Sequence, residues 1–169
     1  MRYAQIRSMD ISNGENIGVA LFVQGCHFHC KNCFNPETWD FNGGKEWTPQ
    51  IEDEFFRLIN RSYIKRISIL GGEPLCRQNC YTTWNLCKKI KQQFPDRKIW
   101  IYSGYTYEEL LQSREQSKAL LFADVLIDGC YIDTQRDITL KWRGSSNQRV
   151  IDLKATMASG KIVLWDNVM

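Results

Sequence analysis

The sequence has no long hydrophobic run, no strong excess of charge and no repeated or low-complexity segment. Its longest continuous apolar run, 17–23, is far shorter than the roughly 20 residues that a membrane-spanning helix needs. The net charge is only +3, so neither nucleic acid nor a membrane surface is expected as the main partner. The first residues lack the apolar centre of a secretory signal peptide. We therefore expect a cytoplasmic protein.

The composition is that of an ordinary globular protein. Of the 169 residues, 43% are hydrophobic and 24% charged, which suits one compact domain. We expect a single domain over 1–169, with its core at about 3–152 and a short C-terminal extension at 153–169. The seven cysteines are odd in number, and in a cytoplasmic chain they indicate metal ligands, redox groups or buried small side chains rather than disulfides.

Turn and capping signals divide the chain into alternating strands and helices. The expected helices begin at Thr48-Pro49, near Asn79 and at Thr106, where Glu109 completes a capping box. Strands are expected at 17–23, 66–70, 98–102 and 124–129, with short extra strands at 149–152 and 161–164. Such alternation implies right-handed crossovers and a mostly parallel sheet. A closed β/α barrel typically needs about 250 residues, so we expect an α/β fold with a partial, open parallel barrel.

Three cysteines follow the first buried strand directly. Cys26, Cys30 and Cys33 lie within eight residues, so their thiolates can wrap one small inorganic centre. A structural zinc site and an ordinary [4Fe–4S] site each take four ligands, whereas three ligands leave one iron open to a substrate. The loop alone also permits a zinc site completed by His27 or His29.

A turn with the sequence Gly71-Gly72-Glu73-Pro74 ends the second strand. Glycines let the backbone approach a ligand closely and leave N–H groups free to point at it, while a neighbouring carboxylate can pair with an ammonium group. By itself such a turn is common. At the strand end that follows a three-cysteine loop, it predicts that the two segments form one site, because functional groups gather at the carboxyl ends of parallel strands.

The cysteine spacing and the glycine–glutamate turn resemble those of the radical S-adenosylmethionine (SAM) superfamily. The resemblance implies a [4Fe–4S] cluster on the three cysteines, with the amino and carboxylate groups of SAM on the open iron. The reduced cluster would cleave the sulfonium C–S bond, and the 5′-deoxyadenosyl radical would abstract a hydrogen atom. In that superfamily the residue before the last cysteine is commonly aromatic and lies against adenine; here it is Asn32.

The same resemblance implies a set of SAM contacts. Gly71, Gly72 and Glu73 would hold the methionine end of the molecule. Ser103, at the end of the third strand, would hydrogen-bond the ligand or cap a turn. The residues expected along the adenosine are Asn32, Cys33 and Phe34.

Five further segments are similar to one subgroup of the superfamily, the activating proteins of anaerobic (class III) ribonucleoside-triphosphate reductases. The segments are 13–26, 33–39, 101–106, 124–129 and 143–149, the last being the most specific. The resemblance implies that the substrate is a glycine near the C-terminus of the large reductase subunit, which becomes a glycyl radical. A reduced flavodoxin-like protein would donate the electron. An open barrel leaves a side through which a peptide loop can enter, whereas a small metabolite suits a closed pocket.

Three other polar residues are candidates for catalysis or for contact with the reductase. They are Asp128, Arg143 and Arg149, and each also has an interpretation as a structural residue within the fold. Two alternatives to the activase remain open. One is another small radical SAM enzyme, similar to 7-carboxy-7-deazaguanine synthase, against which segment 143–149 argues. The other is a zinc-binding interaction module without catalysis.

The remaining cysteines do not indicate a second cluster. Cys76, Cys80 and Cys87 fall on one face of a helix together with Ile90 and Phe94, which is typical of a buried stripe. A second cluster would also need a fourth ligand, and the sequence offers none nearby. Cys130 follows an Asp-Gly turn and has no evident partner in the sequence.

Overall fold

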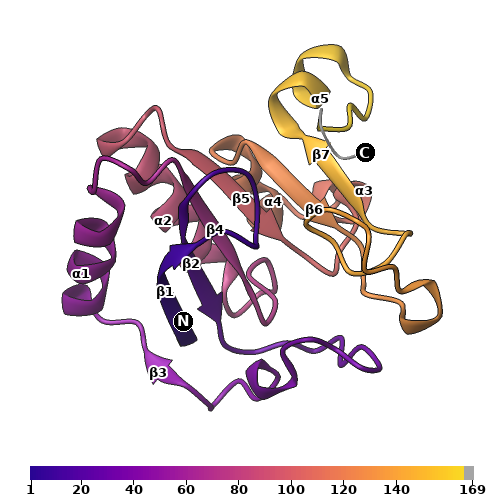
Figure 1. Cartoon of the computed structure of the whole chain (residues 1–169), viewed down its shortest axis with the longest axis horizontal. Coiled ribbons are helices and arrows are strands. Elements are labelled where there is room, and N and C mark those ends of the chain that lie inside the picture. The colour runs from indigo at the N-terminus through magenta and orange to yellow at the C-terminus, as the bar shows by residue number, and fades with distance from the viewer. Residues whose placement is uncertain (166–169) are drawn as a thin grey trace.

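The computed structural model describes residues 1–165 as an α/β fold built on one open sheet of seven strands (Figure 1). The strand order is β3-β1-β2-β4-β5-β6-β7. The central strands run parallel to one another: β2 (Gly18–Val23), β4 (Arg66–Gly71), β5 (Lys98–Tyr102) and β6 (Val125–Asp128). The antiparallel strands lie at the two edges: β1 (Arg2–Asp10) and β3 (Lys45–Glu46) at one, β7 (Arg149–Asp152) at the other. Residues 166–169 of the expected C-terminal extension lie outside the described residues.

The expected central strands and the expected helix starts are confirmed. Helix α1 (Pro49–Ile59) begins at Thr48, whose hydroxyl accepts a hydrogen bond from the Ile51 amide. Helix α2 (Cys80–Gln93) follows Asn79. Helix α3 (Tyr107–Leu111) begins with the predicted capping box of Thr106 and Glu109. These elements formed where local signals predicted them because caps and apolar periodicity act over a few neighbouring residues.

Several elements go beyond the sequence predictions. They are strands β1 and β3, helices α4 (Arg114–Ser117) and α5 (Leu153–Ser159), and the 3-10 helices η1 (Pro36–Thr38), η2 (Lys118–Leu121) and η3 (Asp133–Gln135). The expected strand at 161–164 is wrong, because only Leu164 forms a bridge there, to Ile151. The chain forms helix α5 before that segment, and Asp152 caps this helix by accepting a hydrogen bond from the Ala155 amide. None of the helices in residues 1–165 is long and apolar enough to cross a membrane.

The two faces of the sheet are covered differently. The helix-covered face forms the main core, in which strand residues such as Ile69 and Ile101 pack with Phe55 of α1 and Ile90 of α2. Cys76, Cys80 and Cys87 are all buried, as the core interpretation predicts, although Cys76 precedes α2 and only Cys87 belongs to the main core cluster. The opposite face carries smaller clusters of strand residues with few additions from outside the sheet: Ala20, Phe22 and Leu70 in one, and Trp100, Val125, Ile127 and Val150 in the other. Loops rather than helices therefore cover this second face.

A buried ion pair fixes one of these loops. Arg66 and Asp10 are each about 1% exposed in their side chains, and Arg66 Nη2 lies 2.8 Å from Asp10 Oδ2. The same guanidinium donates hydrogen bonds to the carbonyl oxygens of Asn13 and Glu15. A buried charge is tolerated when its partners satisfy its donors in this way. Arg66 thus holds segment 11–17 against the second face of the sheet.

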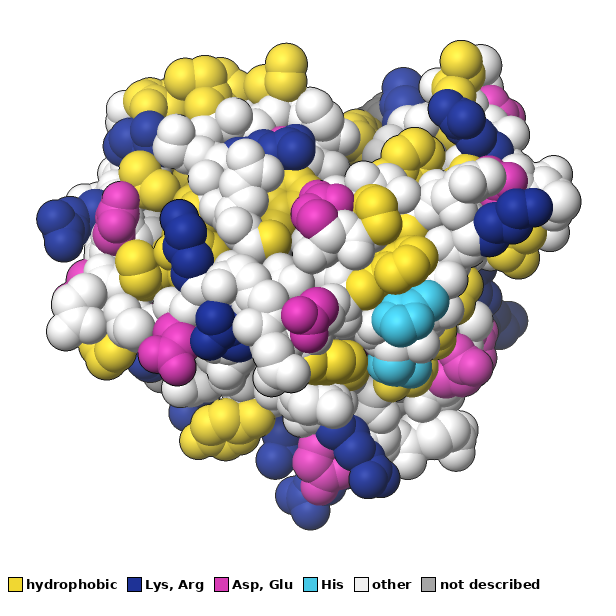
Figure 2. All heavy atoms as spheres, turned by 90° about the horizontal axis from the view of Figure 1, so that it is seen from below, with side chains coloured by type: hydrophobic (Ala, Val, Ile, Leu, Met, Phe, Trp, Pro, Cys, Tyr) yellow, Lys and Arg dark blue, Asp and Glu magenta, His cyan; other side chains and the backbone are white. Residues whose placement is uncertain are grey.

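The cysteine-rich loop after β2 closes upon itself at the surface. Its first residues bind its last, since the amides of Gly25 and Cys26 donate to the carbonyl oxygens of Thr38 and Trp39. The two histidines of the chain lie in this loop and are exposed next to hydrophobic side chains (Figure 2). The closed loop therefore projects beyond the carboxyl end of β2 with both histidines on its outer side.

Candidate functional site

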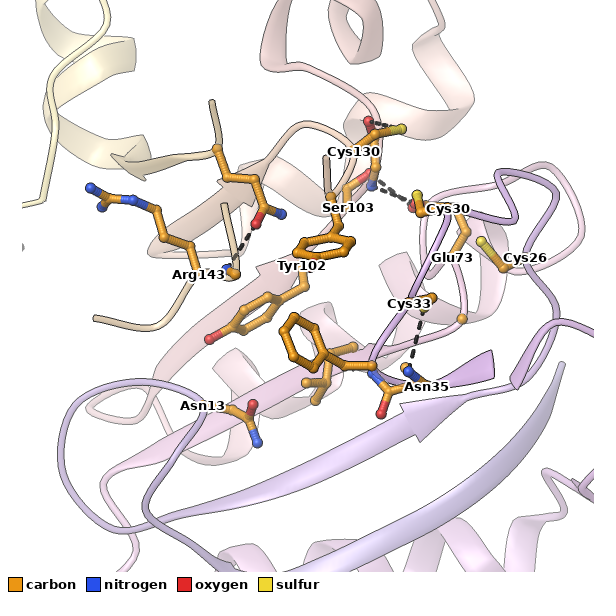
Figure 3. A pocket seen from close by; sticks show the side chains of 18 of the residues that line it. Asn13, Cys26, Cys30, Cys33, Asn35, Glu73, Tyr102, Ser103, Cys130 and Arg143 are labelled. Atoms are coloured by element: carbon orange, nitrogen blue, oxygen red, sulfur yellow. Dashed lines mark hydrogen bonds between the residues drawn. The ribbon is translucent and has the colours of Figure 1, made fainter. Parts of the chain in front are cut away.

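A cavity of about 540 Å³ lies at the carboxyl ends of the parallel strands (Figure 3). The segments after β2, β4, β5 and β6 all contribute to its wall, and segment 140–148 closes another side. Its polar and sulfur-containing wall residues include Cys26, Cys30, Cys33, Glu73, Tyr102, Ser103, Cys130 and Arg143. Parallel sheets place their ligand sites at this end, so the position agrees with the expectation from sequence.

The three predicted cysteine ligands converge on this cavity. Cys26, Cys30 and Cys33 are free thiols, half-buried, and lie along one side of it (Figure 3). Burial raises the pKa of Cys26 to about 11, and the negative charge of Glu73 adds to the effect. A metal ion reverses this preference, because it takes the place of the thiol proton. The arrangement offers three sulfur ligands from one loop to a single space.

The two histidines do not join these thiols. His27 Nε2 lies 3.3 Å from the Tyr105 hydroxyl, and the His29 ring stacks on Trp39 with centroids 4.6 Å apart. Neither histidine lines the cavity. Within residues 1–165, no three His, Cys, Asp or Glu side chains, the three cysteines included, are grouped closely enough to hold a single metal ion. The contacts of His27 and His29 place neither imidazole as a fourth ligand beside the three thiols.

The side chain of Asn32 contacts another segment of the fold. Its φ of +56° is left-handed, a conformation that asparagine adopts more readily than an aromatic residue does. Its side-chain amide donates to Asp133 Oδ2 at 2.8 Å, and the residue is not part of the cavity wall. Phe34 does line the cavity, and its ring meets Tyr131 edge to face at 5.0 Å. Asn32 thus ties the cysteine loop to the segment after β6.

The glycine–glutamate turn packs directly against the backbone that precedes Cys26. The Gly72 amide donates to Val23 O at 2.9 Å, and the Glu73 amide donates to Gly25 O at 2.8 Å. A Cβ atom on Gly72 would lie 2.5 Å from Gly25 O, so only glycine fits there. The expectation that the N–H groups of this turn are free for a ligand is therefore wrong for Gly72 and Glu73. The glycines serve the close approach of two loops.

The carboxylate of Glu73 is turned into the cavity and is about 1% exposed. Its Oε1 accepts hydrogen bonds from the Leu75 amide (2.9 Å) and the Ser103 hydroxyl (2.8 Å), and its Oε2 accepts one from the Gly104 amide (2.7 Å). Burial nevertheless raises the pKa of Glu73 to about 7. Ser103 also lines the cavity, and its hydroxyl donates to Glu73 and accepts a hydrogen bond from the Tyr105 amide at 3.1 Å, which caps the turn after β5. These hydrogen bonds hold the carboxylate in one orientation, and a positive charge nearby would stabilise its ionised form.

Segment 143–149 holds the turn at the end of β6. Gln148 accepts hydrogen bonds from the Gly144 amide and donates to Gly129 O at 3.0 Å. Asn147 donates to Cys130 O at 2.8 Å. The side-chain amides of Asn147 and Gln148 therefore hold the backbone of 129–130, which forms part of the cavity wall. Sequence reasoning singled the segment out, and its position beside that turn gives a physical reason.

Asp128 and Arg149 are partners of each other. The side chain of Asp128 is 1% exposed, and its Oδ1 accepts a hydrogen bond from Arg149 Nε at 3.0 Å. Arg149 also makes a bidentate pair with Glu108, at 3.0 and 2.6 Å, and neither Asp128 nor Arg149 lines the cavity. Their groups are thus occupied within the fold. Arg143 differs, because it lines the cavity and its buried Nε has no hydrogen-bond partner among the described residues.

The sequence indicated no role for two residues of the cavity wall, Cys130 and Tyr102. The Cys130 thiol donates to Gly104 O at 3.3 Å, and burial raises its pKa to about 12, with the charges of Cys30 and Glu73 adding. The Tyr102 hydroxyl is buried without a hydrogen-bond partner among residues 1–165, and burial raises its pKa too. Both residues lie at or just after the end of a predicted strand, and this position is the sequence signal that could have indicated a place in the site.

Comparison with known proteins gives a consistent result. Residues 12–151 match a family model described as a 4Fe-4S single cluster domain. A protein of Vibrio cholerae serotype O1 is 39% identical over 150 residues, which is 88% of this chain and 96% of that protein. One of Escherichia coli K12 is 38% identical over 156 residues (91% and 100%), and one of Enterobacteria phage T4 is 36% identical over 152 residues (89% and 93%). All three are named anaerobic ribonucleoside-triphosphate reductase-activating protein.

Proposed function

The chain belongs to the family of anaerobic ribonucleoside-triphosphate reductase-activating proteins, and from this premise we propose that it generates a glycyl radical on such a reductase by radical SAM chemistry. The whole chain would form a single radical SAM domain, and its open sheet would be a partial barrel of that type. The observation that carries the proposal is the meeting of three thiols and the Glu73 carboxylate in one cavity at the ends of parallel strands.

The residues present fit a [4Fe–4S] cluster with one open iron. Cys26, Cys30 and Cys33 are the three sulfur ligands that a closed loop presents to one side of the cavity. The cavity of about 540 Å³ lies in the range of ligand sites for small molecules. All seven cysteines are free, which agrees with a reducing compartment, and we propose the cytoplasm.

Glu73 would hold the amino group of SAM. A carboxylate has about four acceptor positions, and Glu73 uses three of them on Leu75, Ser103 and Gly104. The remaining position suits an N–H donor of the amino group, and a hydrogen bond to the carboxylate would lower the pKa of Glu73 and favour its ionised form. Tyr102 and Arg143 offer further polar groups, since each has a buried donor without a partner in the described part of the chain. Phe34 would provide an apolar surface beside the adenosine.

The chemistry that the bound groups supply is the reductive cleavage of SAM to methionine and a 5′-deoxyadenosyl radical, which removes an α-hydrogen from the reductase glycine. The residues of this chain orient the reactants for that step. Glu73 would fix the methionine end, the glycine turn would keep Glu73 beside the cysteine loop, and the cysteine loop would hold the cluster. The cavity lies on the face of the sheet that loops rather than helices cover, and a C-terminal glycine loop of the large reductase subunit would enter it between those loops. A reduced flavodoxin-like protein would donate the electron.

An anaerobic pairing assay tests the proposal. The protein is reconstituted with iron and sulfide, reduced, and mixed with SAM and the large subunit of its cognate reductase. We expect a glycyl radical doublet in the EPR spectrum together with 5′-deoxyadenosine. Cys30→Ser should abolish both, whereas the matched control Cys80→Ser, a buried cysteine of α2, should keep both. Absence of both products with the wild-type protein would refute the activase.

A further inference from the structure

We propose that Cys130 is a reserve fourth ligand of the cluster, which binds the open iron until SAM displaces it. The inference rests on the proposed function, because it requires a cluster held by three cysteines. Cys130 lines the same cavity as Cys26, Cys30 and Cys33, although it lies about a hundred residues further along the chain, after β6 (Figure 3). Among the described residues it is the one further thiol on the cavity wall.

The position of the Cys130 thiol indicates which side of the cluster it faces. Its Sγ lies 3.3 Å from Gly104 O, and the amide of the same Gly104 donates to Glu73 Oε2 at 2.7 Å. Cys130 and Glu73 therefore touch the same residue from the cavity side. Glu73 is the group proposed to hold the methionine end of SAM, and the amino and carboxylate groups of that end bind the open iron. The thiol thus stands beside the place to which the open iron would point.

The backbone of Cys130 is held in place by strong hydrogen bonds, whereas its side chain is held only weakly. Gly129 donates to Tyr105 O at 3.1 Å, and Asn147 and Gln148 bind the carbonyl oxygens of Cys130 and Gly129. The thiol itself interacts with Gly104 O and with the Cys30 side chain, and such S–H contacts are weak and cost little to break. A fixed backbone with a weakly held, half-buried thiol suits a ligand that binds and leaves reversibly.

The exchange balances in protons and involves no net oxidation or reduction. When Cys130 binds, an Fe–S bond forms and the thiol proton passes to solvent. When SAM binds, its amino nitrogen and a carboxylate oxygen replace the sulfur on the iron. The ammonium group loses a proton as its nitrogen coordinates, and the released Cys130 thiolate takes one up. SAM and Cys130 are therefore competitors for the same iron.

Cys130→Ala tests this inference, with Cys130→Ser as a conservative second variant and Cys80→Ser as a matched control away from the cavity. Each protein is reconstituted anaerobically, and the EPR spectrum of the reduced cluster is recorded without SAM and with saturating SAM. We expect the spectrum of Cys130→Ala to differ from the wild type without SAM and to coincide with it once SAM is bound. Cys80→Ser should match the wild type in both states.

Two further measurements use the same proteins. Without SAM, Cys130→Ala should lose iron to a chelator at least about tenfold faster than the wild type, as loss of a metal-supporting group typically costs that much in affinity. It should also bind SAM more tightly, since a competitor is gone. Identical spectra and chelation rates without SAM would overturn the inference. Failure of the proposed function looks different: no protein would form a cluster, or SAM would change no spectrum.

Discussion

Replacing Arg149 with methionine should destabilise the folded protein even though the residue lies outside the cavity. Removing one partner of a fully buried ion pair costs about 3–5 kcal/mol, because the other charge stays buried without compensation. Here Asp128 is 1% exposed but the Arg149 side chain is 32% exposed, so water can reach part of the gap. After the substitution Asp128 keeps the hydrogen bond from the Tyr107 amide. We therefore expect a loss of about 2–3 kcal/mol.

Urea unfolding of the metal-free protein under reducing conditions measures this loss. For a chain of this size it corresponds to a fall in Tm of roughly 4–12 °C. Glu108→Gln should cost less than about 1 kcal/mol, since Glu108 is 58% exposed and surface ion pairs contribute little. The double variant Asp128→Asn/Arg149→Met should recover part of the loss. Equal, small losses for Arg149→Met and Glu108→Gln would refute the reasoning and return Arg149 to the candidates for reductase contact.

Three further predictions concern the site and its support. Cys30→Ser should abolish cluster absorbance while leaving the far-UV circular dichroism unchanged, because the loop lies outside the core; unfolding would contradict this. The metal-free protein should lose up to about 3 kcal/mol of stability as pH rises from about 4.5 to 7. The reason is that Glu73, with its pKa raised to about 7, keeps a proton in the folded state that the unfolded chain has already released. In urea titrations at each pH, Glu73→Gln should remove this pH dependence of the unfolding free energy. Arg66→Met should cost about 3–5 kcal/mol by leaving Asp10 buried and unpaired, and a loss comparable to that of a surface substitution would contradict the buried pair.

The sequence predicted the central sheet well because its strands carry local signals. Strands β2, β4, β5 and β6 are apolar and bounded by glycine or polar turns, and their helices begin at recognisable caps. Strand β1 has no such signal, since only Tyr3 and Asp10 of its nine residues are buried. It forms because it pairs with β2 on one side and β3 on the other. Contacts of that kind are set by the tertiary fold.

The candidate site divides in the same way. The cysteine loop and the glycine–glutamate turn are contiguous motifs, so they were recognisable, and the structure brings them to one cavity. The contacts of Cys130 with Gly104 and Asn147 join residues 26 and 17 positions apart, and no local pattern reports them. The left-handed backbone of Asn32 was equally hidden, although it gives a physical reason for asparagine there.

The most direct test of the account follows a single hydrogen atom. A cognate reductase subunit is prepared with glycine deuterated at Cα and is activated anaerobically by this protein with SAM and a reductant. The 5′-deoxyadenosine is then isolated and its mass is measured. We predict a product that carries one deuterium, in an amount that matches the glycyl radical found by EPR. A glycyl radical accompanied by 5′-deoxyadenosine without deuterium would contradict direct abstraction from the reductase glycine.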